Sequence, residues 1–435
     1  MQKTFVLNNG LKIISEKVDG VNSISVGVMI KNGSRNETKD ISGISHFIEH
    51  MLFKGTKKRS AKDIVSQIEN VGGQLNAFTG KEITCYYIKS LSTHLELDLD
   101  ILSDMILNSE FNDEEIEKEK NVVIEEINMN EDMPEDVLEN IHAKSCFGDS
   151  SLSRPILGNI NSIKNLTRDK ILDFISEKYA PQNSVISICG NFDEEKIVSL
   201  IEKYFKNWKS KEFKEDIFLD TKIQSNSLYK SKEIEQLHIN LGLNGLPFGD
   251  ERGYALILLN NIFGGGASSI LFQKVREELG LCYTIYSYAQ PYVNIGSLNI
   301  YIGLSKEQAS KALEVIKREL DTFVKFGITD EEFEINKEKI KANYILGLES
   351  TSSKMFANCR SMLFRGRVRT QEEVIEKIDN ITKEDIDFVL KNCFGKGIIN
   401  TSYVGPNVSA DELDSIVFDS TDGFPKSRNI DKFDI

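Results

Sequence analysis

The stretch GISHFIEHMLFKGT, residues 43–56, places two of the chain's five histidines four residues apart, with a glutamate directly before the second one. On an α-helix, His46 and His50 would project from the same face about one turn apart, and Glu49 would lean toward that face. The apolar residues between them would bury the opposite side. Because this spacing lets two imidazole nitrogens reach one ion, the stretch predicts a short helix that binds a metal.

A histidine in an apolar helix is more often a core residue whose ring is satisfied by a hydrogen bond. With only five histidines in 435 residues, however, a chance His-x-x-Glu-His is expected roughly a few times in a thousand such sequences. The rarity of the pattern therefore favours the metal interpretation.

A catalytic zinc ion needs a third protein ligand and an open position for water. The richest source of carboxylates is NDEEIEKEKNVVIEEINMNED, residues 112–132. Glu119 and Glu126 lie seven residues apart, two helical turns, so both share one face of the expected helix. Spacing alone does not decide among Glu119, Glu125 and Glu126 as the third ligand.

Size and composition limit the possible classes of protein. A chain of 435 residues is expected to form two domains of about 200 residues each. The net charge of −14 argues against a nucleic-acid partner, which usually requires a basic face. We expect no signal peptide and no membrane span, because the sequence contains no long apolar run. Six cysteines without a Cys-x-x-Cys pair favour buried free thiols and a cytoplasmic location.

The expected elements repeat along the chain. Apolar periodicity and glycine stops predict strands over 23–33 and 183–192 and helices over 61–73, 93–108 and 113–131. A polar stretch without clear period, 207–235, is the best candidate linker. Two similar halves follow, which predict domains over 1–212 and 230–435.

Two alignments between segments of the first and second halves of the sequence support the internal repeat. FIEHMLFKGT against ILLNNIFGGGA places His50 opposite Asn261, and NDEEIEKEKNVVI against TDEEFEINKEKIK places Asp113 opposite Asp330. In the second half Ile257 and Asn261 then stand at the histidine positions and Asn260 at the Glu49 position. The second half is therefore expected to be a copy without metal.

Several segments together resemble a known family. GISHFIEHMLFKGTKKR, GGQLNAFTGKE and EKEKNVVIEEI resemble the inverzincin peptidases of the pitrilysin, insulin-degrading enzyme and mitochondrial processing peptidase type, whose signature is His-x-x-Glu-His. The resemblance covers nearly the whole chain, which looks like a half-size member. It implies an α+β fold of two similar domains, each an antiparallel β-sheet packed with α-helices, of which only the first keeps zinc.

The resemblance also implies roles for individual residues. The implied ligands of one Zn²⁺ per chain are His46, His50 and Glu126, the last because shorter family members carry their third ligand 76 residues after the second histidine, which is position 126 here. The implied catalytic residues are Glu49 as general base, Glu119 as a supporting acidic residue, and Arg276 and Tyr283 in FGGGASSILFQKVREELGLCY as oxyanion and substrate contacts. The implied substrate-binding strand contains Asn76, Ala77 and Phe78. Plainer interpretations exist for some of these residues, such as a surface carboxylate for Glu119 and core packing for Phe78. Ile270 and Leu279 stand where the family often has basic residues, and neither is a ligand position.

These residues imply a zinc-dependent endopeptidase that hydrolyses peptides or unfolded polypeptide segments. In a half-size chain, the family's chamber would be closed by two subunits, so a homodimer is expected in which Arg276 and Tyr283 reach the partner's zinc. A processing protease that removes leader or targeting peptides would share every catalytic residue and stays an alternative. A non-catalytic scaffold subunit is a second alternative, although such subunits lose ligands that this chain retains.

Overall fold

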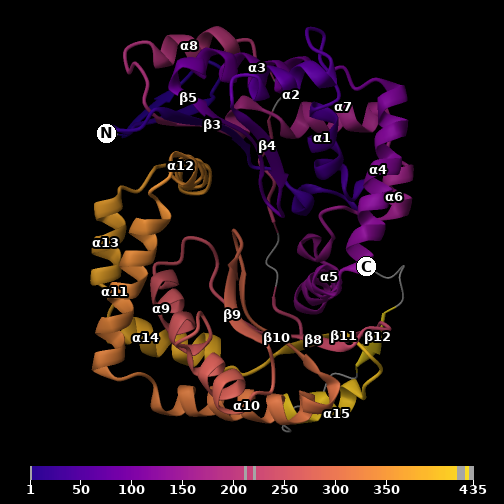
Figure 1. The fold of residues 1–435 in the computed structure, drawn as a ribbon, viewed down its shortest axis with the longest axis vertical. Coiled ribbons are helices and arrows are strands. Elements are labelled where there is room, and N and C mark those ends of the chain that lie inside the picture. Colours follow the sequence, from indigo (N-terminus) through magenta and orange to yellow (C-terminus); the bar gives the residue numbers. More distant parts are fainter. Residues whose placement is uncertain (1, 210–212, 219–221, 419–426, 431–435) are drawn as a thin grey trace. The chain divides into compact units, whose positions relative to one another are not determined.

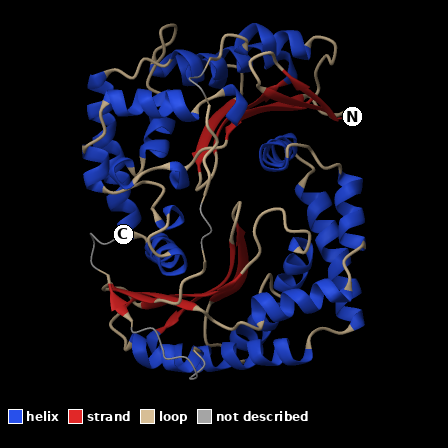
Figure 2. Ribbon diagram, turned by 180° about the vertical axis from the view of Figure 1, so that it is seen from behind, coloured by secondary structure: helices blue, strands red, loops and turns tan. Residues whose placement is uncertain are grey.

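The computed structural model describes residues 2–209, 213–218, 222–418 and 427–430, and these residues form two compact units (Figure 1). Unit 1 comprises Met1–Ile127, Pro155–Ile217 and Ile345–Thr370, and unit 2 comprises Asn128–Arg154, Phe218–Tyr344 and Gln371–Ile435. Each unit has one sheet with helices packed beside it (Figure 2).

The sheet of unit 1 has the strand order β1-β2-β6-β3-β5-β4. Its strands are β1 (Gln2–Val6), β2 (Lys12–Lys17), β3 (Ser23–Ile30), β4 (Gln74–Thr79), β5 (Thr84–Leu91) and β6 (Ser184–Gly190). The central strands β3 and β6 are almost wholly buried, which explains their continuous apolar and small residues. Strand β4 lies at one edge and pairs only with β5 among the described strands.

The sheet of unit 2 repeats this arrangement with the order β12-β7-β11-β8-β10-β9. Its strands are β7 (Ser227–Ser231), β8 (Gln236–Asn244), β9 (Thr284–Pro291), β10 (Gly296–Ser305), β11 (Asn400–Gly405) and β12 (Arg428–Asn429). Strand β9 occupies the edge that corresponds to β4 in unit 1, because β10 pairs antiparallel with both β8 and β9 as β5 pairs with β3 and β4.

The predicted α+β class with two similar domains is confirmed. Both sheets are mixed rather than purely antiparallel, since β2 runs parallel to β6 and β7 runs parallel to β11. These pairs join strands that are far apart in the sequence, so no tight hairpin fixes their relative direction.

The helices of unit 1 lie on both faces of its sheet: those of the first half enclose an apolar core that includes Phe47, Ile48 and Leu99, and α12 (Thr351–Arg365) packs on the opposite face. The helices of the first half are α1 (Ile44–Leu52), α2 (Ala61–Glu69), α3 (Leu95–Asn108), α4 (Asp113–Asp132, which continues into unit 2), α6 (Ile160–Lys164), α7 (Arg168–Lys178) and α8 (Ile197–Phe205). Helix α2 begins at a capping box in which Ser60 and Asp63 satisfy each other's backbone N–H groups.

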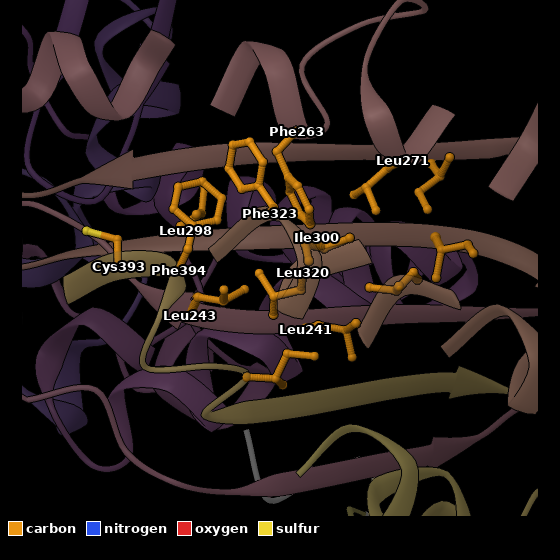
Figure 3. Packing of buried hydrophobic residues seen from close by; sticks show 14 of the residues in the cluster. Leu241, Leu243, Phe263, Leu271, Leu298, Ile300, Leu320, Phe323, Cys393 and Phe394 are labelled. Atoms are coloured by element: carbon orange, nitrogen blue, oxygen red, sulfur yellow. The ribbon is translucent and has the colours of Figure 1, made fainter. Parts of the chain in front are cut away.

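The core of unit 2 is centred on aromatic rings from different helices (Figure 3). Phe263, Phe323 and Phe394 lie with their ring centroids 5.2–5.5 Å apart, the spacing of favourable edge and tilted contacts. The helices of this unit are α5 (Pro134–Phe147), α9 (Gly253–Phe263), α10 (Ala309–Phe326), α11 (Asp330–Gly347, whose last turn belongs to unit 1), α13 (Gln371–Asp379), α14 (Lys383–Val389) and α15 (Ala410–Val417).

Helices α5 and α12 each pack on the sheet of the other half of the sequence. Helix α5 follows α4 in the first half but buries Val137 and Ile141 in unit 2, against Leu228 and Val404. The compact units therefore differ from the predicted ranges 1–212 and 230–435, because an amphipathic pattern shows that a helix packs but not against which sheet.

Helix α12 comes from the second half and buries Met355, Cys359 and Met362 against the sheet of unit 1. Its approach to β3 is close. A Cβ atom at Gly27 would lie 2.2 Å from Met355 Sδ, so only glycine fits there without displacing the methionine. This contact fixes where α12 lies along β3.

The predicted helices and strands agree with the structure to within a few residues, for example 113–131 against α4 and 183–192 against β6. Part of the predicted linker, residues 210–212 and 219–221, lies outside the described residues. All six cysteines are free thiols, and all but Cys282 are buried. Within the described ranges, no helix is both long and apolar enough to cross a lipid bilayer.

Candidate metal centre

Helix α1 carries both histidines and is held at its N-terminus by a carboxylate from outside the helix. Gly43, the N-cap, has φ +92° and offers no side chain, and a Cβ there would lie 2.5 Å from the Leu157 carbonyl oxygen. Instead, the backbone N–H groups of Gly43 and Ser45 donate to Glu37 at 2.7 and 2.9 Å. Because Glu37 is only 3% exposed and both of its oxygens are engaged, it anchors the first turn of α1.

The side chains of His46, His50 and Glu126 converge, the last from α4. Their ligand atoms all lie within 4.8 Å of one another. Glu126 Oε2 lies 3.7 Å from His46 Nε2 and 3.6 Å from His50 Nε2. Among the described residues this is the one group of three or more His, Cys, Asp or Glu side chains with such spacing.

The residues present fit a tetrahedral metal ion. Bonds of about 2.1 Å at tetrahedral angles would separate neighbouring ligand atoms by about 3.4 Å, close to the two distances above. Glu126 Oε2 is buried and has no hydrogen-bond partner within the described ranges. An unsatisfied buried carboxylate oxygen is costly unless a cation or a donor meets it, so this atom is placed as a ligand would be.

The protonation state of His46 also suits metal binding. Burial, with His50 alongside, lowers the pKa of His46 to about 3, so the His46 ring is neutral and can offer a nitrogen lone pair. Burial raises the pKa of Glu126 above its usual value. A cation at this site would favour the ionised carboxylate, since an opposite charge lowers a carboxyl pKa.

Glu119 is not one of the three converging residues but contacts one of them, His50, from outside the cluster. His50 Nδ1 and Glu119 Oε1 are 2.8 Å apart, and Lys54 Nζ is 2.6 Å from Glu119 Oε2. Burial raises the pKa of Glu119, but its hydrogen bonds with His50 and Lys54 outweigh burial and hold the pKa below the usual value. An ionised Glu119 therefore fixes the His50 ring with Nε2 facing Glu126.

Glu49 stands on the same helix, and its carboxylate is held by the edge strand. Thr79, the last residue of β4, donates its hydroxyl hydrogen to Glu49 Oε2 at 2.5 Å. Burial raises the pKa of Glu49 above its usual value, and the Thr79 hydrogen bond opposes that shift. A partly buried carboxylate beside a cluster of candidate metal-ligand side chains has the position that a general base requires.

The three residues expected to bind substrate lie on β4, just before Thr79. Asn76 and Phe78 point to the exposed face of the strand, while Ala77 lies on the partly buried face. Phe78 is 36% exposed, and its ring packs edge-on against Phe356 of α12 with centroids 5.7 Å apart. Strand β4 thus presents an unpaired edge that ends at the Glu49 carboxylate.

Arg276 and Tyr283 lie together in unit 2. The Arg276 guanidinium sits over the Tyr283 ring at 5.3 Å and over the Phe272 ring at 4.4 Å. Tyr283 is 78% exposed, so its hydroxyl faces solvent. The structure brings these two predicted residues together as a pair within unit 2.

Three residues around the centre were not found from the sequence: Glu37, Lys54 and Thr79. Lys54 lies beyond the end of α1 (Ile44–Leu52), so no helical period points to its contact. Glu37 lies in a loop, where no period points to its contact. Thr79 is the last residue of β4, and its partner is 30 residues away in the sequence.

Comparisons with known proteins assign the family. Residues 12–159 match the family described as insulinase (peptidase family M16), and residues 165–340 match the peptidase M16 inactive domain. A protein of Bacillus subtilis (strain 168), named uncharacterized zinc protease YmxG, is 41% identical over 394 residues, which cover 91% of this chain and 96% of the relative. The chain belongs to peptidase family M16. The resemblance inferred from the motifs is thereby confirmed.

Further relatives match this chain over a similar share of its length. An uncharacterized zinc protease of Rickettsia felis is 35% identical over 402 residues, covering 92% of this chain and 97% of the relative. The crystal structure of a protease from Helicobacter pylori has a TM-score of 0.87 with 24% identity, covering 93% of this chain and 99% of that chain, and so shows the same fold. Within this M16 chain, the histidine cluster lies in the segment matched by the first family model, and Arg276 and Tyr283 lie in the segment matched by the second.

Proposed function

We propose that this M16 chain is a zinc-dependent endopeptidase acting on peptides or unfolded polypeptide segments. The observation that carries the proposal is the convergence of His46, His50 and Glu126 beside Glu49, at the end of an unpaired edge strand. The names of the curated relatives as zinc proteases support zinc as the metal. We expect one Zn²⁺ per chain, because one suitable ligand group is found among the described residues.

Each residue of the site has a separate role in the proposed reaction. His46, His50 and Glu126 would hold the ion, which supplies Lewis acidity to polarise the scissile carbonyl and acidify a water molecule. Glu49 takes the proton of the attacking water and passes it to the leaving amine. Glu119, held by Lys54, keeps His50 in the tautomer whose Nε2 lone pair faces the ion.

Strand β4 supplies the substrate site. An extended peptide that adds to this edge would be held by backbone hydrogen bonds, which give affinity with little sequence preference. Side chains on the exposed face would meet Asn76 and Phe78, and the pairing would bring one peptide bond beside Glu49. Such binding requires an extended segment and therefore favours unfolded over folded substrates.

Arg276 and Tyr283 complete the site from a second subunit in this proposal. The exposed Tyr283 hydroxyl and the neighbouring guanidinium form a donor pair suited to an oxyanion or a substrate carbonyl. In a homodimer each subunit would offer its pair to the partner's zinc, and the two subunits would close a chamber around the substrate.

Metal analysis combined with peptide turnover tests the function. The purified chain should contain one zinc ion per chain and hydrolyse a quenched fluorescent peptide. A chelator should abolish turnover and added zinc should restore it. Glu49→Gln should keep zinc but lose turnover. A zinc-loaded chain that hydrolyses no member of a peptide library, or an active Glu49→Gln variant, would refute the proposal.

A further inference from the structure

The hydrogen bond between Thr79 and Glu49 has a counterpart in unit 2. There Ser287, on the corresponding edge strand β9, donates to Asn260 Oδ1 at 2.6 Å, and Asn260 Nδ2 donates to the Ser287 carbonyl oxygen at 3.2 Å. Asn260 stands on α9 at the position that the sequence repeat aligns with Glu49. In both units, therefore, a hydroxyl on the edge strand is hydrogen-bonded to the helix that packs beside it.

The chemical difference between the two contacts is on the helix side. In unit 2 an amide and a hydroxyl exchange two hydrogen bonds, which joins helix and strand and needs no other partner. In unit 1 the helix residue is a carboxylate, and Thr79 donates to one of its oxygens. Within the described ranges, Glu49 Oε1 accepts no hydrogen bond, so it is the oxygen left to meet a water molecule.

The placement of Thr79 makes the contact rigid. Its strand neighbours on the same face, Leu75 and Ala77, pack against the core to which α1 also contributes. A glutamate has three rotatable side-chain bonds, and a hydroxyl fixed on a strand removes most of that freedom for Glu49. A general base that is misplaced by about 1 Å can lose a hundredfold in rate.

From this geometry we propose that Thr79 is a positioning residue for the general base. It holds Glu49 Oε2 so that Oε1 faces the water molecule, and it does so from the strand that pairs with the substrate. Because β4 carries both the peptide-binding edge and the hydroxyl, the alignment of the peptide and of the base are set by one rigid element. The inference rests on the proposed peptidase function.

Three variants of the full-length, zinc-loaded chain separate positioning from structure. Thr79→Val replaces the hydroxyl with a methyl group and keeps the β-branched shape that favours a strand. Thr79→Ser keeps the hydroxyl. Ser287→Ala removes the corresponding hydroxyl in unit 2 and is the matched structural control. For each variant, kcat and KM on a quenched fluorescent peptide, zinc content and melting temperature are measured.

Thr79→Val should lower kcat about ten- to a hundredfold, with KM and zinc content close to those of the wild type. Thr79→Ser should recover kcat to within about threefold. Ser287→Ala should lower the melting temperature without lowering kcat. An unchanged kcat in Thr79→Val, no rescue by Thr79→Ser, or an equal loss of kcat in Ser287→Ala would overturn the proposal.

A crystal structure of the zinc-loaded Thr79→Val chain gives a readout that does not depend on turnover. The Glu49 carboxylate should leave the orientation it has in the wild type, and an unchanged orientation would overturn the positioning role. A wild-type chain without peptidase activity would refute the proposed function instead, and the crystal structure would still decide whether Thr79 orients Glu49.

Discussion

Replacing Glu119 with glutamine should weaken zinc binding without removing a ligand. Glutamine keeps the shape of the side chain and an oxygen for His50 Nδ1, now 2.8 Å from Glu119, but removes the negative charge. A hydrogen bond to a charged group contributes about 1.5–3 kcal/mol and a neutral one about 0.5–1.5 kcal/mol, so about 1–2 kcal/mol is lost at His50.

Loss of the contact between Glu119 and Lys54 adds a smaller free-energy cost. The Lys54 ammonium, 2.6 Å from Glu119 Oε2, would lose its carboxylate, but the lysine side chain is 30% exposed and can turn toward water. A total of about 1.5–3 kcal/mol corresponds to roughly a 10- to 100-fold rise in the dissociation constant for Zn²⁺, the range found for residues that orient metal ligands.

Competition with a chromophoric chelator at fixed pH measures that constant for the wild type and the variant. Glu125→Gln provides the control, because Glu125 is the neighbouring carboxylate on α4 and is exposed. It should bind zinc like the wild type. The orienting role of Glu119 is refuted if Glu119→Gln binds zinc within about twofold of the wild type, or if Glu125→Gln weakens binding as much.

Three further predictions concern other parts of the chain. Burial of Asp98, whose partner is the Ser90 hydroxyl, raises its pKa to about 7. The stability that the protonated group contributes is complete below about pH 4 and is lost as pH rises to about 7. Relative to the wild type, the free energy of unfolding of Asp98→Asn, measured with urea, should therefore rise by up to about 4 kcal/mol across that range. A difference that does not depend on pH would contradict this. In a homodimer, an equal mixture of Glu49→Gln and Tyr283→Phe chains should regain about one quarter of wild-type peptidase activity after subunit exchange; no recovery would place the composite site within one chain. Gly27→Ala should lower the free energy of unfolding by about 1–3 kcal/mol through its clash with α12, and a neutral result would mean that the α12 side chain yields without cost.

The convergence of His46, His50 and Glu126 was largely predictable because these residues follow helical periods. The four-residue spacing of the histidines placed both on one face of α1, as the structure has them. On α4, the period of the buried residues also distinguishes Glu126 from Glu125, which the spacing between acidic residues alone did not. Ile116, Glu119 and Val123 are buried at intervals of three and four, and Glu126 continues that face, whereas Glu125 points to solvent.

The exchange of α5 and α12 was not predictable from the same kind of signal. An apolar stripe shows that a helix has a face to bury, but the partner sheet depends on long-range geometry. The polar contacts that hold these helices are equally non-local. His142 of α5 meets Asn299 and Ser402, and Thr351 of α12 meets Ser25, across 157 or more residues of sequence. No local pattern distinguishes these polar side chains from surface residues.

The repeated fold also explains why, within the part of the chain that the structure describes, the candidate ligand set lies in unit 1 and has no copy in unit 2. A metal site requires several donors that converge, so replacing both histidine positions by Ile257 and Asn261 removes two of three ligands at once. What unit 2 retains is the contact that the fold itself needs, since Asn260 still joins α9 to the edge strand β9. The hydrogen bond between helix and edge strand therefore supports the fold in both units. In unit 1 the helix residue that accepts it is a carboxylate, Glu49, beside the candidate ligand cluster. A function that depends on so few side chains can be present in one copy of a fold and absent from the other at little structural cost.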